Sequence, residues 1–154
     1  RQWSLVGSEM CIRDRIDAGV SPDDLVTFKY EEQGVATLED GIYALEDNLS
    51  DPAFKDKMVR FVRASMKGWK YAEQNPAEAA EIVVDNDDSG AQTVEHNTTQ
   101  MGEIIKLTAG SNGALDPADY QRTVDSLMTG GSDPVITKMP KGAWTHEITD
   151  LALK

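Results

Sequence analysis

One segment of the chain is bounded so sharply that it is expected to fold as a long helix. Ser50, Asp51 and Pro52 mark its start, because an aspartate side chain can cap backbone amides and proline suits the first helical position. Asn75 and Pro76 mark its end. Between them, apolar residues recur every three or four positions, which predicts one core-facing side. We expect that side to hold Phe54, Met58, Phe61, Val62, Ser65, Trp69 and Ala72.

The remaining sequence predicts mostly helices, with two or three short strands. Leu25 to Tyr30 alternates apolar and polar residues, and the apolar Ile42 to Leu45 is short enough for a buried strand. Asn75 and Glu78 have the spacing of a capping box that starts a second helix, through about Val84. Further helices are predicted over residues 91–109 and from Pro117 to Gly130, and a last one is capped by Thr145.

The first fifteen residues are expected to be foreign to the protein. Leu5 to Asp14 can be back-translated, one permitted codon after another, into a transposase sequencing adapter read in frame. Such scars are set aside when a fold is derived. We therefore interpret residues 1–15 as an unstructured adapter artefact, which also sets aside Cys11, the only cysteine. A natural N-terminal strand or arm is the alternative interpretation.

The charge of the chain limits its partners. It carries 27 acidic residues against 15 basic ones, a formal net charge of −12. A surface this acidic repels the phosphates of nucleic acids and of anionic membranes, so we expect neither partner. No apolar run reaches the roughly 18 residues of a transmembrane helix, so we expect no direct membrane insertion.

Residues that often carry chemistry are scattered. His96 and His146 lie far apart, and neither has a second histidine at the spacing of a zinc-protease helix. Asp85 to Asp88 resembles a calcium loop in composition but lacks the EF-hand spacing. The nucleophile motif G-x-S-x-G and the glycine-rich phosphate motifs do not occur. We therefore predict no catalytic residue, no metal site and no cofactor.

The stretch from Gly34 to Pro76 resembles the C-terminal part of solute-binding proteins that serve nitrate/sulfonate/taurine-type ABC importers. The resemblance extends over about residues 16–154. Its features are a Gly34-Val35 turn, the following Thr37 to Asp40, the apolar Ile42 to Leu45, the Asn75-Pro76-Ala77-Glu78 break, and the ending from Gly142 to Leu153.

This resemblance implies an α/β fold of two lobes, the periplasmic-binding-protein fold, of which the chain supplies an incomplete, mostly helical part. Residues 16–41 would form the end of the second lobe and the crossover, and residues 42–154 the C-terminal helical part of the first lobe. The implied function is to capture a small solute (nitrate, sulfonate, taurine or pyrimidine class) and deliver it to ABC permease membrane subunits. It further implies a non-enzymatic protein in the periplasm or another extracytoplasmic space, its signal peptide lost upstream.

Ligand contacts can be carried over from the resemblance only at the crossing, to Thr37, Leu38, Glu39 and Asp40. For Glu39 and Asp40 a solvated turn is the alternative. Two other functions stay open: an enzyme of the thiamine-pyrimidine synthesis group, which shares the fold, and a helical interaction module.

Overall fold

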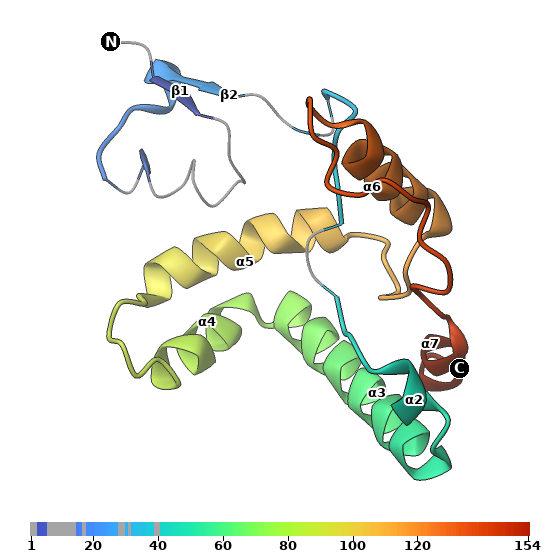
Figure 1. Ribbon diagram of the computed structural model, residues 1–154. Helices are drawn as coiled ribbons and strands as arrows, with labels where there is room; N and C mark the ends of the chain where they lie inside the picture. The colour runs from blue at the N-terminus through green and yellow to red at the C-terminus, as the bar shows by residue number, and fades with distance from the viewer. Residues whose placement is uncertain (1–2, 6–14, 17, 28–29, 31, 39–40) are drawn as a thin grey trace. The chain divides into compact units, whose positions relative to one another are not determined.

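The computed structural model describes residues 3–5, 15–16, 18–27, 30, 32–38 and 41–154. Over these residues the chain is mostly helical, with two strands of three residues each (Figure 1). In chain order the elements are β1 (Trp3–Leu5), the 3-10 helix η1 (Pro22–Asp24), β2 (Leu25–Thr27), α2 (Glu46–Leu49), α3 (Pro52–Gln74), α4 (Pro76–Asp85), α5 (Val94–Thr108), α6 (Pro117–Thr129) and α7 (Glu147–Ala152).

The chain divides into two compact units. The first joins Arg1–Gly41 to Leu115–Ala143, and the second joins Ile42–Ala114 to Trp144–Lys154. The sequence-based division kept residues 42–154 together, because no sequence pattern marks a change of unit near residue 115. The assignment of these parts to lobes stays a prediction.

Helix α3 begins where the capping signals predicted. Asp51 Oδ1 accepts a hydrogen bond of 2.9 Å from the Ala53 amide, and Pro52 occupies the first helical position, where a missing amide proton costs no helical bond. The helix ends at Gln74, directly before Asn75. The prediction of one long helix between these signals is confirmed.

The capping box predicted at the start of α4 is wrong. The Asn75 side chain makes no capping bond to α4, and its Nδ2 instead donates to the Tyr71 carbonyl at 2.9 Å. Glu78 Oε2 accepts a 2.6 Å hydrogen bond from the Tyr71 hydroxyl. This bond to the carboxylate raises the pKa of Tyr71 above its ordinary value of 10.0, with smaller contributions from desolvation and from the charge of Glu78. Both side chains thus face back toward α3, because they can satisfy groups of its last turn.

Two of the other predicted helices form with adjusted limits. Helix α5 starts at Val94 rather than residue 91, because Thr93 Oγ1 accepts a hydrogen bond of 3.2 Å from the His96 amide and so caps the helix. Helix α7 starts at Glu147, whose amide donates to Thr145 Oγ1 at 3.1 Å. The Thr145 hydroxyl, which was predicted to cap this helix, therefore accepts a hydrogen bond from the first turn of α7.

The predicted strand over Leu25 to Tyr30 is confirmed in part. Strand β2 covers Leu25–Thr27 and pairs in parallel with β1, with Trp3 opposite Leu25. Tyr30 lies in a turn, and Phe28 and Lys29 lie outside the described residues. The pairing of β1 differs from the expectation that residues 1–15 are unstructured, since extended backbone at Trp3–Leu5 can satisfy the amides and carbonyls of β2. The origin of residues 1–15 as an adapter stays a prediction.

The prediction of a buried strand over Ile42 to Leu45 is wrong. These residues form no ladder in the described part of the chain, and their side chains are exposed, that of Tyr43 to 84%. A strand is stabilised by hydrogen bonds to a neighbouring strand. The only described ladder, β1–β2, does not include this stretch.

The core of the second unit lies where α3 meets α7. Val59 and Val62 of α3 and Ala152 of α7 are buried together, and Met66, Ile148 and Leu153 pack against them. The interval from Val59 through Val62 to Met66 follows helical periodicity, so one stripe of α3 faces this core.

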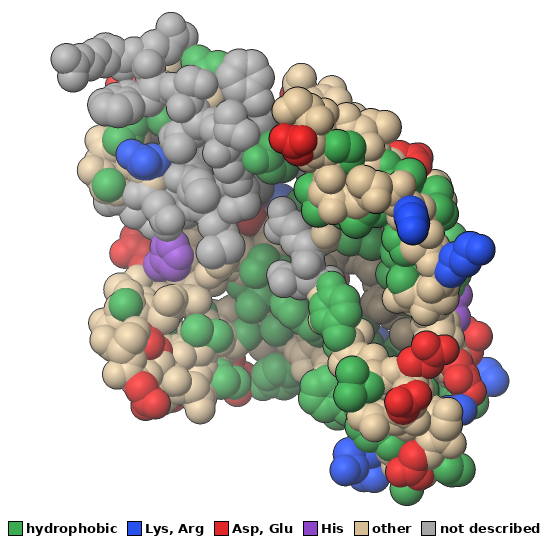
Figure 2. All heavy atoms as spheres, viewed as in Figure 1, with side chains coloured by type: hydrophobic (Ala, Val, Ile, Leu, Met, Phe, Trp, Pro, Cys, Tyr) green, Lys and Arg blue, Asp and Glu red, His purple; other side chains and the backbone are tan. Residues whose placement is uncertain are grey.

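That stripe differs from the predicted one at two aromatic residues. Phe61 is 53% exposed and Trp69 is 51% exposed, so their predicted place in the core is wrong, whereas Val62 is buried as predicted. Apolar residues lie on more than one side of α3, and contact with α7 selects the valine side. Figure 2 shows hydrophobic side chains at the surface beside acidic ones.

Polar contacts add to the packing of α7 on α3. Arg63 Nη2 donates to the Leu151 carbonyl at 3.0 Å, and its Nε donates to the Ala152 carbonyl at 3.2 Å. These carbonyls belong to the last turn of α7, where no helical amide can bond to them. Lys55 Nζ also forms a 2.5 Å ion pair with Glu147 at the start of α7.

Candidate ligand-binding segment

The predicted pocket segment is held by α6, which belongs to the same unit. Asp116 Oδ1 accepts a hydrogen bond of 2.7 Å from the Ala118 amide, and Pro117 fills the first helical position. Val124 is buried on one side of the helix, with 2% of its surface exposed. The helix ends at Thr129, before Gly130, as predicted. Capping and burial therefore make α6 a defined support for polar side chains.

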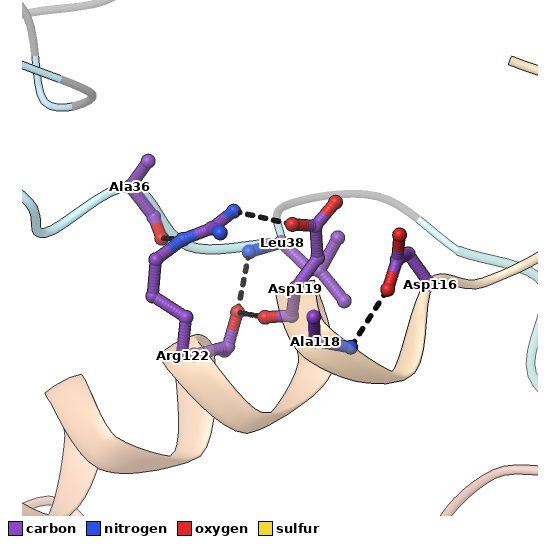
Figure 3. Close-up of polar contacts among 7 residues, drawn as sticks. Ala36, Leu38, Asp116, Ala118, Asp119 and Arg122 are labelled. Atoms are coloured by element: carbon purple, nitrogen blue, oxygen red, sulfur yellow. Dashed lines mark hydrogen bonds and ion pairs between the residues drawn. The ribbon is translucent and has the colours of Figure 1, made fainter.

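Two consecutive residues of α6 bond to the backbone on both sides of Thr37 (Figure 3). Arg122 Nε donates to the Ala36 carbonyl at 3.0 Å. Thr123 Oγ1 accepts a hydrogen bond of 2.8 Å from the Leu38 amide. The segment from Ala36 to Leu38 is thus held at two points by side chains more than 80 residues further along the chain.

Asp119, one turn earlier on α6, orients both of these side chains (Figure 3). Its carboxylate forms a 2.8 Å ion pair with Arg122 Nη2, and its backbone carbonyl accepts a 2.9 Å hydrogen bond from Thr123 Oγ1. The Thr123 hydroxyl therefore donates within the helix and accepts from the segment. The charge of Arg122 is already balanced by Asp119.

The four predicted ligand residues divide into two groups. Thr37 and Leu38 are described and exposed, and 41% of the Leu38 surface is accessible. Glu39 and Asp40 lie outside the described residues. Thr37 makes no hydrogen bond to another described residue, so its hydroxyl can serve as a donor and an acceptor toward a ligand. This arrangement offers polar recognition.

Sequence reasoning missed Arg122 and Thr123. Their contacts with Ala36 and Leu38 join residues 86 and 85 positions apart, and no motif links the two regions. A helix with an apolar stripe predicts which side of α6 is polar, but not what that polar side contacts. The one local signal available was the spacing of Asp119 and Arg122, which allows an ion pair on one side of a helix.

The acidic loop after α4 uses its central carboxylate within the loop. Asp87 Oδ1 accepts from the amide and the hydroxyl of Ser89, and its Oδ2 accepts from the Gln92 amide at 2.8 Å. The bond from the Ser89 hydroxyl, followed by those from backbone amides, lowers the pKa of Asp87 below its ordinary value of 3.8. Among the described residues, no group of three His, Cys, Asp or Glu side chains is arranged to hold a metal ion.

A concave surface lies between α3 and α5. Its cavity of about 370 Å³ is lined mainly by Met66, Trp69, Met101, Ile104 and Ile105. Gly113 also lines the cavity with a positive φ of +81°, and a Cβ there would clash with the Met66 sulfur. This mainly apolar lining suits packing more than recognition of a polar solute.

None of the helices in the described part of the chain combines the length and apolar character needed to cross a membrane. The described elements are mostly helical, and one polar segment is bonded to α6. The family model described as NMT1/THI5 like matches residues 9–79. Residues 9–79 are therefore similar to the NMT1/THI5-like family, which comprises ABC transporter solute-binding proteins and THI5-type enzymes.

The family match covers the candidate segment. It includes Thr37 to Asp40 and all of α3 but not α6, so it does not reach the residues that clamp the segment. It begins at residue 9, inside the stretch predicted to derive from an adapter. No curated protein and no solved structure shows a significant match to the chain.

Proposed function

We propose that the protein is an extracytoplasmic solute-binding protein of an ABC importer, with a two-lobe periplasmic-binding-protein fold. The observation that carries the proposal is the NMT1/THI5-like match over residues 9–79. The protein would close its lobes around a small solute and deliver it to the membrane subunits of a permease. Closure would be a shift of population driven by contacts that only the closed form makes.

Within this function, the candidate segment contributes the contacts of Thr37, Leu38, Glu39 and Asp40. The hydroxyl of Thr37 supplies a neutral hydrogen-bonding group, and the sequence adds two carboxylates directly after Leu38. Because Arg122 is paired with Asp119, its charge is compensated. Two carboxylates favour a solute with a cationic group. Among the solute classes considered, taurine carries an ammonium and nitrate does not, so we propose taurine-like amino sulfonates over nitrate.

The test is a titration of the 154-residue chain, followed by NMR, with taurine, ethanesulfonate, nitrate and a formyl-aminopyrimidine. Ethanesulfonate is the matched control, because it lacks only the ammonium of taurine. A two-lobe clamp draws its affinity from both lobes, so we expect this chain to bind taurine weakly, with a Kd of about 1 mM. The amide signals of Thr37 and Leu38 should shift with taurine and much less with ethanesulfonate.

Variants separate site residues from the rest of the surface. Glu39→Ala and Asp40→Ala should each weaken taurine binding more than tenfold, about 1.4 kcal/mol. Thr37→Val should weaken it too, whereas Thr99→Val, which removes a hydroxyl that donates to the Glu95 carbonyl within α5, should not. Unchanged binding in both variants would favour the alternative interpretation, in which Glu39 and Asp40 belong to a solvated turn and do not contact the solute.

The family also includes THI5-type enzymes, so a pyrimidine is the solute that distinguishes the second candidate function. Strong preference for the formyl-aminopyrimidine over taurine would favour that enzyme class. Binding of none of the four solutes would overturn the transport proposal.

A further inference from the structure

The two bonds from α6 occupy the backbone groups on either side of Thr37. The Ala36 carbonyl accepts from Arg122 Nε, and the Leu38 amide donates to Thr123 Oγ1 (Figure 3). Fixing a carbonyl and an amide two residues apart removes most of the rotational freedom of the peptide units between them. The direction in which the Thr37 side chain leaves the segment is therefore set by α6.

We infer that Arg122 and Thr123 are positioning residues for Thr37, and that they direct its hydroxyl toward the solute. This inference rests on the proposed solute-binding function. Because the Ala36 carbonyl and the Leu38 amide are occupied, they are withdrawn from ligand recognition. Between these two occupied groups lie the hydroxyl, amide and carbonyl of Thr37, which make no hydrogen bond to another described residue.

Arg122 and Thr123 should differ in how well a conservative substitution preserves their contacts. Arg122 donates in two directions at once, from Nε to Ala36 and from Nη2 to Asp119, which a planar guanidinium can do in fixed geometry. A lysine ammonium carries no such fork, so Arg122→Lys should not preserve the contact with Ala36. The contact of Thr123 needs only a hydroxyl, so Thr123→Ser should preserve it.

The direct test measures exchange of the Leu38 amide proton with solvent deuterium in the 154-residue chain by NMR. In Thr123→Val the acceptor is lost and the side chain keeps its shape, so exchange should become about fivefold faster. Thr123→Ser should exchange at the wild-type rate. Thr129→Val is the matched control, because its hydroxyl also donates to a carbonyl one turn back on α6, at 2.7 Å to Asp125, without touching the segment.

Taurine titration of the same variants tests the consequence for binding. Thr123→Val and Arg122→Lys should weaken binding about tenfold with an unchanged melting temperature, and Thr123→Ser should restore the wild-type affinity. Faster exchange at Leu38 with unchanged affinity would overturn the positioning role, as would equal exchange rates in Thr123→Val and Thr129→Val. If none of the four solutes shifts a signal of the wild-type chain, the proposed function fails, and Leu38 exchange still decides whether the clamp exists.

Discussion

The contact of α3 with α7 predicts which side of the long helix stabilises the second unit. Val62 is 6% exposed and packs with Val59 and Ala152. Val62→Ala removes two buried methyl groups, worth about 0.8 kcal/mol each, and leaves a small cavity. The higher helix propensity of alanine offsets about 0.5 kcal/mol. We therefore expect a loss of about 1–2 kcal/mol in the free energy of unfolding.

Urea unfolding followed by far-UV circular dichroism measures this loss. Val83→Ala is the matched control, because the same two methyl groups are removed from a helical residue that is 42% exposed. We expect the control to change stability by less than about 0.5 kcal/mol. Equal losses in the two variants would refute the assignment of the core. A loss of about 3–5 kcal/mol for Phe61→Ala, the cost expected for a fully buried phenylalanine, would restore the orientation predicted from the sequence.

Three further predictions concern other parts of the chain. Arg63→Met should lower unfolding stability by about 1 kcal/mol, since two carbonyls of α7 lose their donors; faster amide exchange in α7 than in α5 checks it. Because folding lowers the pKa of Asp87, its carboxylate should contribute to stability above pH 3.8. This contribution should be lost as the pH falls through the lowered pKa of the folded state, so Asp87→Asn should flatten that part of an acid-unfolding curve. Deleting residues 1–15 should cost less than about 2 kcal/mol in thermal unfolding, because a two-stranded pair is marginal by itself; a larger loss contradicts the adapter interpretation.

The sequence predicted the features that depend on neighbouring residues. The start of α3 at Asp51-Pro52 and that of α6 at Asp116-Pro117 follow from local capping, and both caps bond as expected. Failures arose where a distant partner decides the outcome. Ile42 to Leu45 is apolar enough for a strand, yet no described strand pairs with it. On α3, periodicity finds apolar sides but cannot say which one meets α7.

The same limit applies to the candidate segment. Family resemblance was enough to select Thr37 and Leu38, because it relies on the local order of turn, segment and helix. It could not supply Arg122 and Thr123, whose role exists only through a contact with the segment. The ligand contacts of Thr37 and Leu38 stay a prediction of the resemblance, whereas the residues that hold the segment in place could be found only from the coordinates.

Three helices start at a capping residue that is followed by proline and alanine. This one sequence pattern serves two structural roles. The side chains of Asp51 and Asp116 each accept a hydrogen bond from the backbone amide two residues further along the chain. In both places the side chain acts only on the helix that it starts. Asn75 stands where one helix ends and the next begins, and its side-chain amide donates to the Tyr71 carbonyl of the preceding turn. A carboxylate cannot donate and would face the negative end of the α3 dipole. The choice of asparagine at this junction therefore follows from the helix before it.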